Sequence, residues 1–382
     1  MAGPVKTLLR SGQFGYLSEK IEGLELRRRV LKNYYERSNR WRISSNTNRN
    51  IVVSPDEVLV KVGDQDTYIE RANIDLSSSN NWLSTGTDYT VGSNRAGKDF
   101  YIFATSNGFK FTDSKTEDDT RKLIGGFHCL CTSAGTLYSY VNSVDDEALV
   151  DEAYVSHNIT GTKHWLDGYV AGDVLPFSLW DLQHRPASDP EGMVYDPGSN
   201  LWVDIYLASW DGSHLVSENG GTIADGASTP AFHQYKFSQH FGRQKKKLPR
   251  QDEFVSLSLG SPQGVSISGS ADPGTTGGHS ATNSQRILSL IGVEDATGVL
   301  WQWGREGGAT NDVGSAYADA FDGNDSNVAG QQYEAPNRPL FGGRWGVGAR
   351  CGSRGSVWAD PALYLDASVG ARGVAEPYGG RA

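Results

Sequence analysis

Sulfur-containing residues are scarce in this 382-residue sequence, which has three cysteines and two methionines. Cys129, Cys131 and Cys351 are too few and too unevenly placed to form a disulfide framework. Cys129 and Cys131 alternate within a strand-like segment, which predicts that both point to one face, and their spacing is not that of a zinc site. The chain is long enough to build its cores from apolar packing instead.

Long apolar runs are also missing. No hydrophobic region of a signal peptide follows Met1, and no apolar stretch approaches the length that spans a bilayer. We therefore expect no signal peptide and no membrane insertion. If the protein works outside a cell, we expect it to arrive there by assembly or lysis.

Sequence patterns of known catalytic sites are absent as well. The eight histidines show no HExxH spacing, and neither a GxSxG elbow nor a Walker loop occurs. His233 and His240 have no cysteine nearby, so we interpret them as surface or capping residues. The sequence thus predicts no catalytic residues and no enzyme.

Positive charge is concentrated at the start of the chain. Residues 1–42 contain ten Lys or Arg and four Glu, a balance of +6, whereas the whole chain has a net charge of −10. The remaining residues therefore carry −16, and a body this acidic argues against nucleic acid, whose phosphates require clustered cations. We expect no nucleic-acid partner.

Glycine and aromatic residues are abundant, with 46 Gly, 17 Tyr and 10 Trp. Together with many Ser, Asn, Asp and Thr, they favour strands and turns over helices, so the expected fold class is β-rich α+β. Residues 17–41 are the exception and predict a helix, either a single amphipathic helix or a short oligomerising bundle. Its apolar residues fall on alternating steps of four and three, a series that Arg28 interrupts: Leu17, Ile21, Leu24, Leu31 and Tyr35.

Residues 51–175 predict an antiparallel sandwich or barrel. Apolar and polar residues alternate in 51–63 around Ser54-Pro55. Residues 98–112 predict two strands joined at Ser106-Asn107-Gly108, a strong hairpin signal. Residues 121–133 add a strand with a bend at Gly125-Gly126. We therefore expect three parts: an N-terminal attachment or trimerisation segment (1–50), helical or small β; a β-sandwich domain (51–175); and a C-terminal domain (176–382).

The C-terminal part contains one short predicted helix. Leu248-Pro249 would precede it, Asp252 and Glu253 would lie in its first turn, and Gly260 would end it. The basic run that leads into it, from Arg243 to Arg250, is interpreted as a solvated edge. Strands are expected at 201–207 and within 299–309, where the second strand ends in glycines, and long loops at 261–283 and 311–337.

One of these loops carries oxygen ligands at calcium-like spacing, in residues 322–327 (Asp-Gly-Asn-Asp-Ser-Asn). The segment lacks the terminal Glu of an EF-hand, so we assign no metal site. No cofactor is expected, and a structural Ca²⁺ or Mg²⁺ stays open.

The segment from Leu340 to Val374 obeys neither a strand nor a helix pattern. We call its residues chosen for backbone shape and packing the frame: Gly342, Gly343, Trp345, Gly352, Trp358, Gly370 and Gly373. Between them stand side chains that mix charge, size and polarity. A fixed frame that presents arbitrary side chains is typical of a binding surface.

Several long motifs resemble known families. LPRQDEF (248–254), VLWQWGRE (299–306) and LFGGRW (340–345) resemble the C-type lectin domains of the formylglycine-generating-enzyme subtype. More of the chain resembles the major tropism determinants, phage tail-tip receptor-binding proteins that a diversity-generating retroelement diversifies. The residues that carry this resemblance are 98–111, 121–128, 178–193, 202–207, 221–226 and 340–374.

The resemblance implies a homotrimer with C-terminal C-type lectin domains that bind a host cell-surface protein or glycan. It also implies contacts with other tail-fibre proteins and a place at the virion's tail-fibre tip, or at a cell surface if a cell encodes the chain. The retroelement mutates adenines, chiefly in AAY codons. Twelve positions are then expected to vary, here called the display positions: Arg344, Gly346, Val347, Gly348, Arg350, Val357, Ala359, Asp360, Tyr364, Asp366, Ser368 and Val369.

A display position has to tolerate many residue types without unfolding the domain, so we expect all twelve to face solvent. Trp345 and Trp358 fall between them as scaffold residues. Two other functions are considered. One is an oxidase of the formylglycine-generating type, which would need a pair of cysteines where Cys351 stands alone. The other is a structural tail or fibre protein whose lectin-like domain is not diversified.

Overall fold

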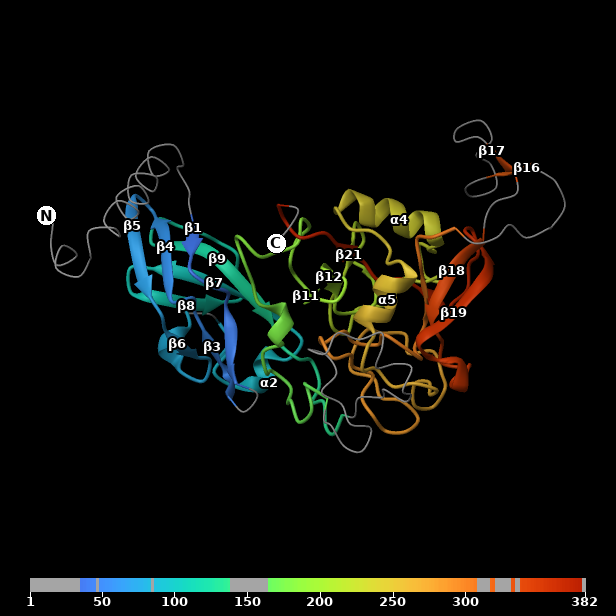
Figure 1. The fold of residues 1–382 in the computed structure, drawn as a ribbon, viewed down its shortest axis with the longest axis horizontal. Coiled ribbons are helices and arrows are strands. Elements are labelled where there is room, and N and C mark those ends of the chain that lie inside the picture. The colour runs from blue at the N-terminus through green and yellow to red at the C-terminus, as the bar shows by residue number, and fades with distance from the viewer. Residues whose placement is uncertain are drawn as a thin grey trace, which may run out of the picture.

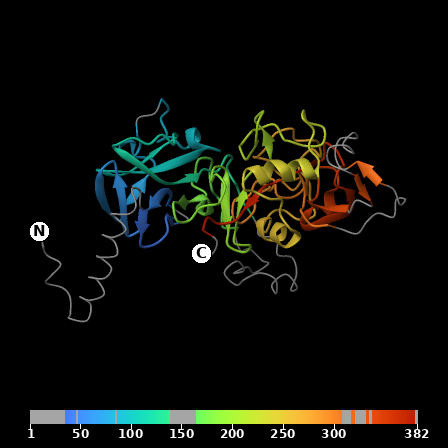
Figure 2. The same cartoon turned by 90° about the horizontal axis from the view of Figure 1, so that it is seen from above.

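The computed structural model describes residues 35–45, 48–83, 86–137, 164–307, 317–319, 331–333 and 337–379. Figure 1 shows an elongated molecule with the N-terminal strands at one end and the strands of the last third at the other. In the view of Figure 2 the green segment, roughly residues 165 to 215, lies between these ends. Strands outnumber helices, which confirms the β-rich class, and within the described ranges no helix is long and apolar enough to cross a membrane.

The N-terminal half is built of two layers of antiparallel strands around one core. One layer consists of two small sheets. The first contains β1 (Tyr35–Arg37), β4 (Glu57–Val62) and β5 (Gln65–Glu70). The second contains β2 (Arg42–Ser45), β3 (Asn48–Val53) and β6 (Asn73–Asp75). The other layer is a single sheet in the order β10 (Trp180–Asp181), β9 (Arg121–His128), β7 (Asp99–Thr105) and β8 (Gly108–Thr112). β7 and β8 form the hairpin predicted from the Asn-Gly pair.

Aromatic side chains fill the core between these layers. Phe100 is fully buried, and its ring lies 5.1 Å from Trp82, 4.9 Å from Tyr89 and 5.8 Å from Phe127. Such offset and edge-on ring pairs stabilise a core beyond the area that they bury. Short elements border this half: η2 (Ser79–Asn81) and α2 (Gly92–Arg95).

Gly125 and Gly126 lie inside β9, and the pairing of β9 with β7 is irregular between Leu123 and Gly125, next to the predicted bend. A Cβ on Gly125 would lie 2.4 Å from the carbonyl oxygen of Trp180, and one on Gly126 would lie 2.8 Å from the Trp180 ring. The glycines are therefore required by the close approach of β10 rather than by a turn.

The predicted helix over residues 17–41 is wrong in its last part. Tyr35–Arg37 form β1, in which Tyr35 pairs with Val60 of β4. Trp41 is buried in the sandwich core, with its ring edge-on to Phe109 at 4.9 Å. Pairing with an existing strand thus overrides the helical spacing here, and residues 17–34 of that prediction lie outside the described residues.

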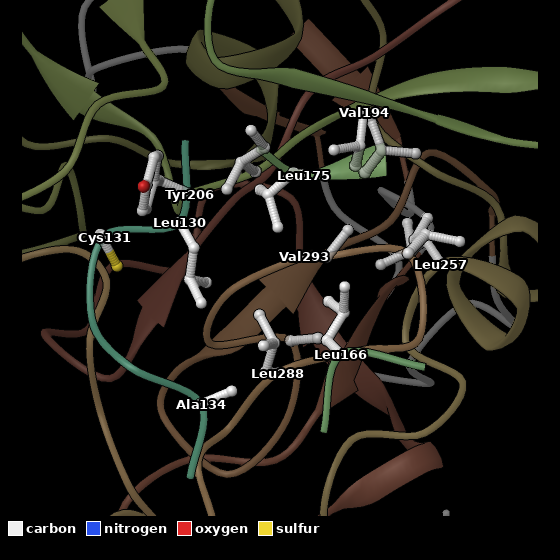
Figure 3. Packing of buried hydrophobic residues seen from close by; sticks show 14 of the residues in the cluster. Leu130, Cys131, Ala134, Leu166, Leu175, Val194, Tyr206, Leu257, Leu288 and Val293 are labelled. Carbon is white, nitrogen blue, oxygen red and sulfur yellow. The ribbon is translucent and has the colours of Figure 1, made fainter. Parts of the chain in front are cut away.

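Segments on both sides of residue 175 share a sheet and a core. β10 follows η3 (Pro176–Ser178) and extends the sandwich sheet. Figure 3 shows Leu130 and Leu175 packing with Val194 and Val293 in one cluster. The boundary expected at residue 175 stays a prediction.

The two cysteines that follow β9 do not point to one face. β9 ends at His128, and beyond it Cys129 packs in the sandwich core whereas Cys131 packs in the cluster of Figure 3. The expectation that they share a strand face is wrong because the strand has already ended.

Two sheets and two helices organise the C-terminal half. One sheet has the order β11 (Met193–Asp196), β12 (Leu201–Asp204) and β21 (Val374–Ala375). The other has the order β19 (Gly352–Pro361), β18 (Asn337–Gly342), β15 (Trp301–Trp303) and β20 (Val369–Gly370). A short hairpin joins β13 (Ser209–Trp210) to β14 (Leu215–Val216).

The predicted short helix is confirmed as α5 (Gln251–Leu257). The Glu253 carboxylate accepts a hydrogen bond from the Arg250 amide at 2.7 Å, which caps the helix start. Gly260 follows the helix with a φ of +85°. A second helix, α4 (Gln234–Arg243), was not expected from the sequence, and His233 caps it by accepting from the Lys236 amide, as its capping interpretation requires.

The interpretation of the basic run as a solvated edge is wrong at Lys246. Its side chain is buried, and its Nζ lies 2.6 Å from Asp204 Oδ1. Burial raises the pKa of Asp204, while the adjacent Lys246 ammonium opposes that rise. Lys246 thus ties the end of α4 to β12.

The two predicted loops differ. Residues 261–283 contain no helix or strand, as expected, and only isolated bridges. Within 311–337, β16 (Tyr317–Asp319) pairs with β17 (Gln331–Tyr333), so part of that loop is a hairpin. The calcium-like segment 322–327 lies outside the described residues.

Candidate functional site

The segment predicted to bind ligand lies on an edge of the four-stranded sheet. β19 pairs only with β18 in this sheet, with Leu340 opposite Val357 and Arg338 opposite Asp360. Figure 1 places β18 and β19 at the end of the molecule opposite the N-terminal strands. As an edge strand at the end of an elongated molecule, β19 has one unpaired side that is open to a partner.

Two frame glycines shape the loop between β18 and β19. Gly342 has a φ of +90° and Gly343 a φ of +86°, conformations that other residues rarely adopt. A Cβ on Gly342 would lie 2.7 Å from the Ala296 carbonyl oxygen, and one on Gly343 would lie 2.7 Å from the Cα of Cys351. The chain therefore turns sharply here while packed against its neighbours.

Both frame tryptophans are half-buried and packed inward. Trp345 packs beside a core cluster that contains Val299, and its amide donates to the Val299 carbonyl at 3.0 Å. Trp358 lies edge-on to Phe341 with ring centroids 6.2 Å apart. These contacts support the scaffold role predicted for both residues.

Residues distant in sequence also hold this segment. The side-chain oxygen of Gln263 accepts a hydrogen bond from the Ser353 amide at 2.9 Å. The amide of Gly226 donates to the Asp366 carbonyl at 3.2 Å, and a Cβ on Gly226 would lie 2.0 Å from the Asp366 nitrogen. Nothing in the sequence identified Gln263, whereas Gly226 belongs to residues 221–226 (GTIADG), one of the motifs that carry the family resemblance.

A buried arginine anchors the end of the segment. Arg372 is fully buried, and its guanidinium donates to the carbonyls of Asp204, Ile205 and Glu294 and to Oε1 of Gln302. Burial lowers its pKa to about 10, a value at which it still carries its charge at neutral pH. The sequence did not single out this residue.

The twelve display positions occupy three stretches of chain. The loop after β18, including η5 (Gly348–Arg350), carries five of them, β19 carries three, and the turn after β19 with β20 carries four. Gly346, Arg350 and Ala359 are exposed. Seven others are half-buried: Arg344, Val347, Gly348, Val357, Asp360, Tyr364 and Asp366.

The expectation that all twelve face solvent is wrong for Ser368 and Val369. They are 5% and 2% exposed, respectively. Val369 begins β20 and pairs with Trp301, and the Ser368 carbonyl accepts from the Trp301 amide at 2.9 Å. We call the other ten positions the display surface.

Three stretches of the display surface meet above one core. Val347 from the loop, Val357 from β19 and Tyr364 from the turn all pack against the cluster that contains Leu340 and Trp301. Side chains from separate stretches therefore converge on one side of the sheet, as one binding surface requires.

Charged groups are coupled across the same surface. Burial and the nearby Asp366 carboxylate raise the pKa of Asp360. At Asp366 burial acts to raise the pKa, but hydrogen bonds from Ser368 and Tyr364 outweigh it and hold the pKa below its ordinary value. Burial and the bond to Asp366, with 3.1 Å between the oxygens, raise the pKa of Tyr364. Asp366 therefore stays ionised and also orients its own turn.

No metal centre is found in the parts of the chain that the structure describes, where no three His, Cys, Asp or Glu residues gather as ligands. The cysteines offer no oxidase chemistry either. All three are buried and free, and burial raises the pKa of Cys351 to about 11. A thiol of this kind, without a second cysteine beside it, is a poor copper ligand or nucleophile.

Comparisons with known proteins agree with this geometry, although no family model matches the chain. The tail fiber receptor-binding protein of Bordetella phage BPP-1 is 30% identical over 322 residues, which cover 77% of this chain and 75% of that protein. Solved structures of Major Tropism Determinant variants share the fold. The M1 and P3c variants each give a TM-score of 0.66 at 24% identity. Each match covers 91% of this chain, together with 86% of the M1 chain and 87% of the P3c chain.

These relatives are receptor-binding and tropism-determining proteins and not enzymes, in agreement with the absence of catalytic motifs in the sequence. The identity and the coverage of the phage protein establish kinship over most of the chain. The chain belongs to the family of this phage tail fibre receptor-binding protein, and it shares the fold of the Major Tropism Determinant variants.

Proposed function

We propose that this chain is the receptor-binding protein of a phage tail fibre and that its ligand surface is the display surface on a C-type lectin scaffold. One observation carries the proposal. Val347 of the loop, Val357 of β19 and Tyr364 of the turn pack against one core, while glycines and backbone hydrogen bonds from other segments hold much of the frame. A surface supported in this way can change its side chains without losing its shape.

The display surface contains side chains suited to binding. Arg344, Arg350 and Tyr364 are of the types that dominate interface hot spots, and Asp360 and Asp366 would set the charge preference. Gly348 sets a limit on variation, because its φ of +49° favours Gly, Asn or Asp. Ser368 and Val369 would vary only at a cost to packing.

The proposal includes three parts along the chain: an attachment or trimerisation segment in residues 1–50, a sandwich domain over 51–175 and a lectin domain over 176–382. The strands from Tyr35 onward already pair within the sandwich. The chain would form a homotrimer on the virion, contact other tail-fibre proteins and bind a host cell-surface protein or glycan. Weak binding at one site would then be raised by the three copies and by several fibres.

The DNA beside the gene tests the diversification. We expect a near-identical template repeat with adenines at the codons of the display positions, next to a reverse-transcriptase gene. A repeat whose adenines fall on frame codons such as Trp345 or Gly343, or no repeat at all, would favour the alternative of a structural fibre protein that is not diversified.

A further inference from the structure

An exposed leucine lies within the display surface without being a display position. Leu365 is 46% exposed and stands between Tyr364 and Asp366. Of the large apolar side chains that are exposed in the described residues, it is the one that lies in the segment from Leu340 to Val374. Single exposed leucines are common on protein surfaces, but this one stands on a turn that is held in place.

The turn that carries Leu365 is fixed on both sides. The Tyr364 amide donates to the Pro361 carbonyl at 2.9 Å, and the Val369 amide donates to the Asp366 carbonyl at 3.1 Å. Little conformational freedom is left for the turn to lose when a ligand binds.

A separate segment presses against the backbone of the same turn. A Cβ on Gly226 would lie 2.7 Å from the carbonyl carbon of Leu365, so this position has room for glycine alone. Tyr364 packs inward on the core, and Asp366 bonds within the turn. Leu365 is therefore the residue of the three whose side chain the fold leaves unused.

We propose that Leu365 is a constant apolar anchor of the ligand surface, which seats in an apolar depression on a protein ligand whatever residues the display positions hold. The inference rests on the proposed function. A rigidly presented leucine gains affinity from burial against apolar side chains. It offers no aromatic face for stacking on a sugar, which favours a protein over a glycan.

The neighbours of Leu365 argue for a ligand rather than for a second copy of this chain. Asp360 and Asp366 lie close enough to influence each other, and Asp366 stays ionised. Permanent interfaces between copies are depleted of charge at their centres, because these charges would lose water without a partner. Because the display positions vary, they can supply charges complementary to those of a ligand, which can then bind beside Asp360 and Asp366.

Selected binders test the anchor. The full chain, randomised at the ten positions of the display surface, would be selected separately against hen egg lysozyme and against streptavidin. Leu365→Ser would then be introduced into several binders to each target, with Val170→Ser as the matched control. Val170 is 53% exposed and lies outside the Leu340–Val374 segment.

We expect Leu365→Ser to weaken binding about tenfold in binders to both targets. Val170→Ser should change affinity less than twofold, and melting temperature and assembled mass should be unchanged in both variants. Unchanged affinity after Leu365→Ser would overturn the anchor, and so would a change of assembled mass, which would place Leu365 between copies. A folded library that yields no binder would instead contradict the proposed function.

Discussion

The sandwich and the Leu340–Val374 segment use their side chains in opposite ways. In the sandwich, side chains such as Phe100 and Phe127 fill the core and thereby hold the strands together. In the segment, much of the shape depends on glycines, on Gln263 and Gly226 from elsewhere, and on the buried Arg372. Some of its side chains, such as Arg350 and Ala359, are exposed.

This difference teaches how one chain can combine stability with variation. A side chain that makes the fold cannot change freely, because close-packed interiors respond to the loss of a single methylene group. A backbone held by glycine contacts and remote hydrogen bonds can carry many side chains. Stability and binding are then assigned to different residues.

The largest effect is expected in the sandwich. Phe100→Ala should lower the free energy of unfolding by about 3–5 kcal/mol, because it removes a ring packed against three others. Urea unfolding followed by tryptophan fluorescence measures this loss. The milder Phe100→Leu should cost about 1–1.5 kcal/mol. Equal losses for both variants would mean that ring packing is not what holds this core.

A second substitution tests the frame of the display surface. Gly226→Ala should cost about 2–3 kcal/mol, because its Cβ would overlap the backbone of Leu365 and Asp366. Gly242→Ala is the matched control, since no atom lies within 4 Å of its Cβ position in α4. The control should be neutral or stabilising by up to about 1 kcal/mol. Equal melting temperatures for the two variants would contradict the claim that Gly226 supports the turn that carries Leu365.

Acid should weaken the junction between the two halves through His184. Its ring packs 4.8 Å from Tyr195 and 5.1 Å from Trp202. Burial, with Arg40 and Arg37 nearby, lowers the pKa of His184 to about 3, against an ordinary value of about 6.5 in the unfolded chain. The stabilisation is complete above pH 6.5 and is lost as the pH falls toward 3, because the unfolded chain takes up the proton first.

His184→Phe keeps a ring and removes this titration. Between pH 7.5 and 5.0 the unmodified protein should lose up to about 2 kcal/mol more stability than the variant. Urea unfolding at both pH values measures the difference. His214→Asn, at an exposed histidine, should follow the unmodified protein. The prediction fails if the His184→Phe variant loses as much stability as the unmodified protein.

Elements whose structure depends on local interactions were predicted from local sequence signals. The Asn-Gly pair located the β7–β8 hairpin, and Pro249 with Glu253 located the start of α5. α4 was missed although Phe237 and Phe241 have helical spacing, because polar residues surround them. β1 was missed because its structure comes from pairing with β4.

The site was predictable to a similar extent. Sequence and resemblance predicted the segment and its frame, and Val347, Val357 and Tyr364 from its three stretches pack against one core. The burial of Ser368 and Val369 could not be predicted, because it arises from parallel pairing of β20 with β15. The supporting contacts of Gln263 and Arg372 likewise depend on distant segments meeting in the fold.

The most direct test of the separation between frame and display is the melting temperature of one fourfold variant. Arg344, Arg350, Ala359 and Asp360 would all be replaced by Ser, since none of them belongs to a core cluster. The account predicts a melting temperature within about 4 °C of the unmodified protein, as expected for surface substitutions. A fall of more than about 10 °C would show that the display side chains hold the fold, and it would contradict the account.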